Sequence, residues 1–215
     1  MNTRKIAFLV SASLSVMTSF SYAASIPLSA SPQSKIWIEG KSTLHPFTIK
    51  ASTFNLQMSF EAPPQEKTLM EILKAPSVHL MVTVPVKSLK SEFEVMDDNI
   101  QKAMKAKKYP NVIFSLTSYA ISQGGKKETI SVPGTLLISG VSRPGTLHAS
   151  IVTSKSKITI NGTQKIRMSD YGIKPPTLMF DTIKVEDLIL VHYHLILIFQ
   201  TSGKNISNDS LTIKN

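Results

Sequence analysis

Apolar and polar residues alternate with a period of two along much of the chain, beginning near residue 35. In residues 53–60, for example, Phe54, Leu56, Met58 and Phe60 fall on one face and polar residues on the other. Residues 77–86 and 157–168 repeat the pattern with valine, leucine and isoleucine on the apolar face. This period is typical of half-buried β-strands, and we expect eight or nine of them. Residues 188–200 form the last strand and are apolar on nearly both faces.

Strands with one solvent-exposed face and one buried face predict an antiparallel sheet folded into a sandwich or a closed barrel. Closure is favoured because it leaves no unpaired sheet edge. A barrel of about eight strands either fills with side chains or holds one small ligand. The inward positions here carry Ile, Val, Leu, Met and Phe with almost no charge. A cavity would therefore be apolar, but alternation alone leaves a filled core equally open.

Two segments follow a helical spacing instead. In residues 88–107, apolar residues recur three and four positions apart, which predicts an amphipathic helix packed on the barrel. Pro110 follows this segment and would close it. A shorter helix is expected at residues 66–75, where Pro76 would end it. The pattern thus predicts one or two short helices.

The two ends of the chain differ from its middle. Arg4 and Lys5 precede a short apolar stretch, and small residues gather at residues 21–24, as in a cleavable secretory signal. The apolar stretch is short for a membrane span, which needs about 20 residues. We therefore expect a signal peptide at residues 1–24, a barrel domain at 35–201, and a flexible Ser-, Asn- and Lys-rich tail at 202–215. The expected location is periplasmic or secreted.

The chain carries a formal net charge of +10 and contains no cysteine. The lysines are scattered and form no dense run, so we expect no nucleic-acid partner. The basic charge is compatible with a transient contact with an anionic membrane surface. Without cysteine the exported domain must be held by its core alone, and thiol chemistry and thiolate metal sites are excluded.

Candidate chemistry is sparse. His192 and His194 would share a strand face, but the spacing suggests no third ligand, so we expect no metal. Asp97 and Asp98 are neighbours that would diverge by about 100° on a helix, which makes them a poor acid–base pair. We expect neither a catalytic residue nor a cofactor.

Four local patterns together resemble the YceI-like family of exported bacterial proteins. Residues 40–47 read Gly-x-Ser-Thr-x-His-x-Phe, and residues 109–114 read Tyr-Pro-x-x-x-Phe. Residues 134–143 read Gly-x-Leu-x-x-x-Gly-Val-x-Arg, and residues 170–173 read Asp-Tyr-Gly-Ile. Their order and spacing are similar to the family's from about residue 35 to residue 200. The resemblance implies an extended, lipocalin-like, eight-stranded antiparallel β-barrel. It also implies a protein that binds an isoprenoid or similar amphiphilic lipid inside the barrel, without catalysis.

The candidate ligand-binding residues follow from the predicted inward faces and from the family motifs. The apolar candidates are Phe54, Leu56, Met58, Phe114, Leu136, Ile138 and Phe199. The polar candidates are His45, Asp170 and Arg143. His45 could equally pin the first hairpin by a hydrogen bond, and Asp170 and Arg143 could be turn residues.

Two other functions remain open at this stage. One is a lipid-headgroup hydrolase that uses His45 as the base and Asp170 as its partner. The other is a protein-interaction module with a filled core. We expect transport or sequestration of the lipid as the function, with the oligomeric state left undetermined.

Overall fold

The computed structural model describes residues 28–60, 78–116, 120–122, 128–154, 157–178 and 182–199. The predicted signal peptide at residues 1–24, the predicted helix at residues 66–75 and the predicted tail at residues 202–215 lie outside these ranges.

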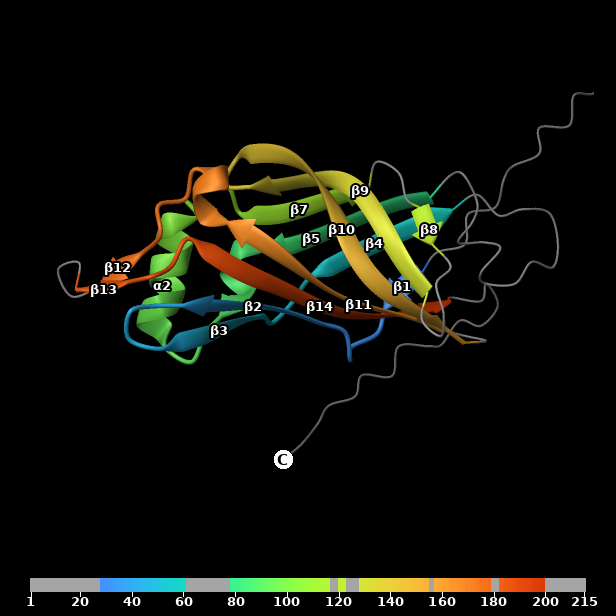
Figure 1. Ribbon diagram of the computed structural model, residues 1–215, viewed down its shortest axis with the longest axis horizontal. Helices are drawn as coiled ribbons and strands as arrows, with labels where there is room; N and C mark the ends of the chain where they lie inside the picture. The colour runs from blue at the N-terminus through green and yellow to red at the C-terminus, as the bar shows by residue number, and fades with distance from the viewer. Residues whose placement is uncertain are drawn as a thin grey trace, which may run out of the picture.

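Antiparallel strands make up most of the described chain and curl around a common interior (Figure 1). The strands of the first half are β1 (Leu28–Ala30), β2 (Lys35–Lys41), β3 (Pro46–Ala51), β4 (Asn55–Phe60), β5 (Val78–Pro85) and β6 (Leu89–Lys90). Those of the second half are β7 (Asn111–Leu116), β8 (Ala120–Ser122), β9 (Glu128–Ile138), β10 (Val141–Thr153), β11 (Lys157–Arg167), β12 (Thr177–Leu178), β13 (Ile183–Lys184) and β14 (Leu188–Phe199). The remaining elements are η1 (Val86–Ser88), α2 (Glu94–Ala103) and η2 (Met168–Tyr171).

The short strand β1 joins the two ends of the sheet. It pairs with β14 along its whole length and with β4 at Leu28. The path β1-β4-β5-β7-β9-β10-β11-β14 therefore returns to β1 through eight strands, and every pairing is antiparallel. Strand β14 also pairs with β2, from which β3 and β6 extend the sheet. These pairings confirm the predicted eight-stranded antiparallel barrel.

An aromatic ring lies against a glycine in the barrel wall, where a side chain would not fit. Gly162 in β11 faces Tyr193 in β14, and a Cβ at Gly162 would lie 2.2 Å from the Tyr193 hydroxyl oxygen. That hydroxyl donates a hydrogen bond of 3.0 Å to the backbone carbonyl of His148 in β10. The Tyr193 ring therefore crosses β11 inside the barrel, and burial raises its pKa to about 12.

The hairpin between β9 and β10 uses a two-residue turn of Ser139 and Gly140. Both residues have positive φ, 51° and 81°, as a type I′ turn requires. The Ser139 hydroxyl donates to the backbone carbonyl of Met104 at the end of α2, at 3.0 Å. This bond ties the hairpin to the helix.

Helix α2 lies across one end of the curled sheet (Figure 1). The prediction of a helix over residues 88–107 was too long at both ends. Leu89 and Lys90 pair instead with β3 as strand β6, so the apolar Leu89 belongs to the sheet. Lys105 has a φ of 53°, and this left-handed residue ends the helix. In the described part of the chain, no helix is long and apolar enough to cross a membrane.

Candidate ligand-binding cavity

The interior of the curled sheet contains a cavity of about 430 Å³. This volume lies within the range of about 300–1,000 Å³ typical of sites for small molecules. The walls come from the inward positions of the strands and from one face of α2, and apolar side chains dominate them. Among the described residues, no lysine, arginine, aspartate or glutamate lines the cavity. The space is therefore suited to an apolar body.

The alternation of the strands explains why the walls are apolar. Along β11, Ile158, Ile160 and Ile166 face the interior, while Lys157 and Lys165 are exposed. In β14, Leu195 and Leu197 are buried in the same core. Each strand thus supplies one apolar row, and the rows surround the space without filling it.

Most of the apolar candidates from the sequence lie at this cavity. The described residues that line it include Leu56, Met58, Phe114, Leu136 and Ile138. Phe54 instead packs among core residues and does not line the cavity. Phe199 ends β14, and its side chain is not among those that the structure describes.

Asp170 and Arg143 lie away from the cavity. Both residues are exposed and neither lines it. The Arg143 Nε donates a hydrogen bond to the backbone carbonyl of Asp170, which ties β10 to η2. Either side chain could therefore contact only a part of a ligand that lies outside the cavity.

His45 lines the cavity from the loop between β2 and β3. Its Nδ1 donates to the backbone carbonyl of Pro46 at 2.8 Å. Ser42 holds the same loop, because its hydroxyl donates to the His45 carbonyl at 2.8 Å and accepts from the His45 amide at 3.2 Å. Among the described residues, no hydrogen bond or ion pair joins His45 to Asp170. The two groups of the hydrolase hypothesis are not brought together.

An apolar rim consists of three exposed residues that also line the cavity. Leu44, Phe93 and Val95 are 67%, 60% and 69% exposed, respectively. Leu44 comes from the β2–β3 loop, and the other two come from the start of α2. The apolar lining therefore continues from the interior onto the protein surface, and we call these residues the apolar rim.

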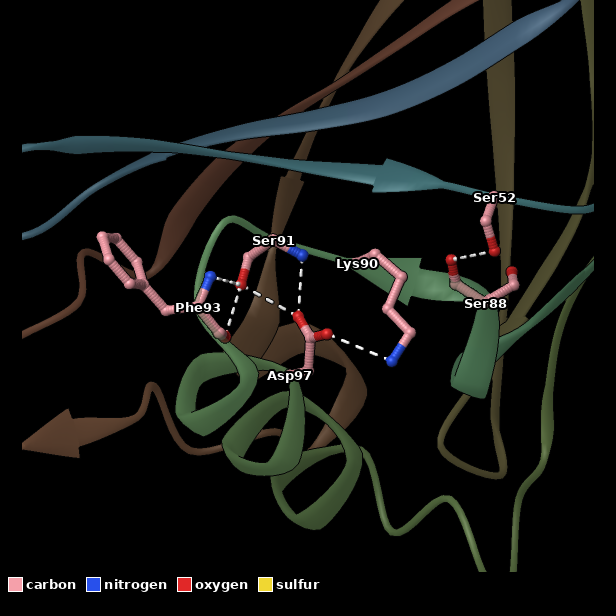
Figure 2. A network of polar contacts seen from close by, with 6 residues as sticks. All are labelled: Ser52, Ser88, Lys90, Ser91, Phe93 and Asp97. Atoms are coloured by element: carbon pink, nitrogen blue, oxygen red, sulfur yellow. Dashed lines mark hydrogen bonds and ion pairs between the residues drawn. The ribbon is translucent and has the colours of Figure 1, made fainter. Parts of the chain in front are cut away.

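A network of polar contacts fixes the segment that leads into α2 (Figure 2). The carboxylate of Asp97 accepts hydrogen bonds from the Ser91 amide at 2.7 Å and from the Ser91 hydroxyl at 2.9 Å, and lies 3.1 Å from the Lys90 ammonium. Burial alone would raise the pKa of Asp97. The hydrogen bonds and the ion pair outweigh it and hold that pKa below its ordinary value. Lys90 and Ser91, which precede Phe93, are thus bound to Asp97, which follows it, and these contacts fix the segment between them.

Hydrogen bonds at Ser88 also connect this segment to the sheet. The Ser88 hydroxyl lies 2.8 Å from the backbone carbonyl oxygens of both Thr53 and Pro85, and its one proton is shared between these two acceptors. The Ser52 hydroxyl in turn donates to the Ser88 carbonyl at 3.1 Å, as Figure 2 shows. The start of α2 is therefore fixed to the junction of β3 and β4.

Polar residues inside the cavity were missed from the sequence. Asn99 on α2 and Gln164 on β11 both line it, and both are half-buried. Gln164 could have been found from the period of two, because it stands between Gly162 and Ile166 on the inward face of β11. Asn99 could not, because the apolar stripe of the helix gave no sign of a polar inward position.

His192 and His194 lie on the outer face of β14. The His192 ring stacks on Trp37 at 5.0 Å between ring centroids, and its Nδ1 lies 2.9 Å from the Thr163 hydroxyl. Its Nε2 lies 3.3 Å from a carboxylate oxygen of Glu39. In the part of the chain that the structure describes, no three His, Cys, Asp or Glu side chains gather as metal ligands. The contacts of His192 are those of a packed surface residue.

The fold is a hollow antiparallel barrel with an apolar interior, and the comparisons identify its family. The YceI-like domain model matches residues 32–195, so the chain belongs to the YceI-like family. A search of curated proteins found no match.

Three solved structures share the fold. The chain is similar to BcnA of Burkholderia cenocepacia, with 22% identity and a TM-score of 0.61 over 76% of this chain and 96% of that one. It is also similar to a polyisoprenoid binding domain from Saccharophagus degradans implicated in plant cell wall breakdown, with 11% identity and a TM-score of 0.60 over 81% and 99% of the two chains. A YCEI protein of Campylobacter jejuni matches at 23% identity and a TM-score of 0.51, over 71% and 84%.

Proposed function

We propose that this protein binds an isoprenoid or a similar amphiphilic lipid in its cavity, for transport or sequestration and without catalysis. The observation that carries the proposal is the cavity of about 430 Å³ with no charged side chain among its described lining residues. Burial of apolar ligand surface in such a space is favourable by about 25 cal/mol per Å². The similar structure from Saccharophagus degradans is that of a polyisoprenoid binding domain, which agrees with this proposal.

The first test is native mass spectrometry of the protein purified from its own host, followed by organic extraction of whatever is bound. We expect a discrete mass adduct that extraction removes and that proves to be an apolar or amphiphilic lipid. A clean apo mass that persists after incubation with isoprenoid alcohols, isoprenoid quinones and fatty acids would overturn the proposal.

We further propose that the protein is exported and works in the periplasm or outside the cell. The support is the signal-like sequence at residues 1–24. Fractionation of the host, with N-terminal sequencing of the recovered protein, tests this part separately. A protein in the exported fraction that begins near residue 25 is the expected result, and an uncleaved cytoplasmic protein would contradict it.

Entry of the lipid would be easiest from a membrane surface. The apolar rim of Leu44, Phe93 and Val95 offers a path from the surface to the interior. Without Arg4 and Lys5 the formal net charge is 22 − 14 = +8, which favours a transient contact with anionic lipid. A flotation assay with phosphatidylglycerol-containing vesicles measures this contact. Binding that weakens when Phe93 and Val95 are both changed to Ser supports it, and binding unchanged by those substitutions speaks against it.

The hydrolase alternative draws no support from the site. Its base and partner, His45 and Asp170, share no contact among the described residues, and only His45 lines the cavity. Turnover of lipid extracts that disappears in a His45→Ala variant would nevertheless establish it.

A further inference from the structure

The polar groups of the cavity define what kind of head group a buried ligand can carry. We infer that the cavity selects an uncharged, hydrogen-bonding head group, such as an alcohol, carbonyl or amide, through Asn99 and Gln164, and excludes a phosphate or carboxylate head. This inference rests on the proposed function, since it concerns the ligand of the same cavity.

The first step is the composition of the described lining, in which His45 is the only basic side chain. No Lys, Arg, Asp or Glu is among the described residues that line the cavity. An ionised head group moved from water into an apolar enclosure without a partner is strongly disfavoured. Arg143, the cation that the family motif placed among the candidates, lies outside the cavity and donates to the Asp170 carbonyl. A charged head would therefore have to stay in solvent.

The second step is the small number of polar groups with free hydrogen-bonding capacity. Three of the polar lining residues already use their side chains within the protein. The Ser42 hydroxyl donates to the His45 carbonyl, the His45 Nδ1 donates to the Pro46 carbonyl, and the Tyr193 hydroxyl donates to the His148 carbonyl. These bonds occupy Ser42, Tyr193 and one ring nitrogen of His45, whereas the His45 Nε2 and the Tyr171 hydroxyl make no hydrogen bond with any described residue.

Asn99 and Gln164 are the two carboxamides among the described lining residues. The Asn99 amide makes no hydrogen bond with any described residue, and the Gln164 amide makes one long contact, 3.4 Å from its Nε2 to the Lys165 carbonyl. A carboxamide offers both a donor and an acceptor. Each can therefore satisfy a hydroxyl, a carbonyl or an amide, but neither supplies the positive charge that an anionic head requires.

The third step is their placement. Asn99 lies on α2, which closes one end of the curled sheet, and Gln164 lies on the inward face of β11. Apolar residues surround both, including Met96 and Ala103 on the helix and Ile166 on the strand. A few polar groups in an apolar wall fix the orientation of a ligand and give it specificity. The head group would thus be held inside the cavity.

The test compares three ligands that share one isoprenoid tail: farnesol, farnesyl phosphate and the hydrocarbon farnesane. Each competes with a fluorescent apolar reporter for the mature protein. We expect farnesol to bind at least about tenfold more tightly than farnesyl phosphate, because the phosphate lacks a counter-ion in the cavity. Equal or tighter binding of farnesyl phosphate would overturn the inference.

Two variants test the named residues. Asn99→Leu and Gln164→Leu should each weaken farnesol binding by about tenfold and leave farnesane binding unchanged, since the hydrocarbon needs no hydrogen bond. Asn55→Leu and Gln57→Leu make the same changes at exposed positions of β4 and serve as matched controls. Farnesol affinity unchanged in both cavity variants would refute the role of these residues.

The outcomes separate this inference from the proposed function. If the wild-type protein binds none of the three ligands and no other lipid, the proposed function fails. If it binds farnesane and both farnesyl compounds with similar affinity, it is a lipid-binding protein without head-group selection, and only the present inference fails.

Discussion

At the scale of single residues, the close approach of Tyr193 to Gly162 makes a sharp prediction. Gly162→Ala places a Cβ within 2.2 Å of the Tyr193 hydroxyl and displaces the ring from its bond to His148. We expect a loss of about 1–3 kcal/mol in the free energy of unfolding, measured by urea denaturation. Gly145→Ala is the matched control, because a Cβ there meets nothing within 4 Å. Equal stability of the two variants would contradict this account of the Gly162–Tyr193 contact.

Asp97 predicts a pH dependence of stability. Its pKa in the folded protein lies below the ordinary value of 3.8, so its contribution is present above that value. That contribution is lost as the pH falls through the lowered pKa of the folded state. At pH 7 we expect Asp97→Asn to cost about 1.5–3 kcal/mol, the range for hydrogen bonds to a charged group.

The measurement is the difference in unfolding free energy between wild type and Asp97→Asn from pH 7 down to pH 2. It should shrink as the pH falls below about 4. Asp187, whose pKa is lowered chiefly by its hydrogen bonds from Ser169, titrates in both proteins and cancels from the difference. A difference that stays constant over this range would show that Asp97 does not act through its charge.

At the scale of elements, the polar network of Figure 2 makes the start of α2 a separately testable unit. Ser91→Ala removes the hydroxyl that donates to Asp97 and leaves the backbone amide bond intact. We expect faster hydrogen exchange in the first turn of α2, with little change in the strands. Ser142→Ala, at an exposed position of β10, is the control. Uniformly faster exchange throughout the molecule would instead mean a global loss of stability.

The strands could be predicted from the sequence because each carries its own period of two. The closed barrel was favoured because it leaves no unpaired edge, and the family resemblance implied its eight strands. The start of α2 could not be predicted in the same way. Leu89 fits the apolar spacing of a helix, but its backbone pairs with Ala51 in β3, and that contact is set by tertiary structure. The residues of the candidate site were predicted only in part, for a similar reason. Alternation placed Leu56 and Phe114 on the inner face, whereas nothing local showed that Arg143 would turn to the Asp170 carbonyl.

At the scale of the whole molecule, the decisive property is that the barrel is hollow. The inward rows were compatible with a filled core, and the volume of about 430 Å³ arises from how the curled sheet and α2 enclose them together. No single element contains that information. Because the interior has room, a larger inward side chain should reduce ligand binding without the cost that overpacking brings to a filled core.

Val191→Trp tests this property directly. Val191 lines the cavity, so the indole should occupy ligand space and weaken binding of an apolar reporter by at least about tenfold. The unfolding free energy should fall by less than the about 1–3 kcal/mol that added volume costs in a filled core, because a hollow interior accepts it. Val152→Trp introduces the same ring at a position that is 53% exposed, and it should bind like the wild type. If Val191→Trp fails to fold, Ile160→Phe adds less volume to the same cavity and answers the same question. Undiminished binding in a folded cavity variant would mean that the lipid binds elsewhere on the protein.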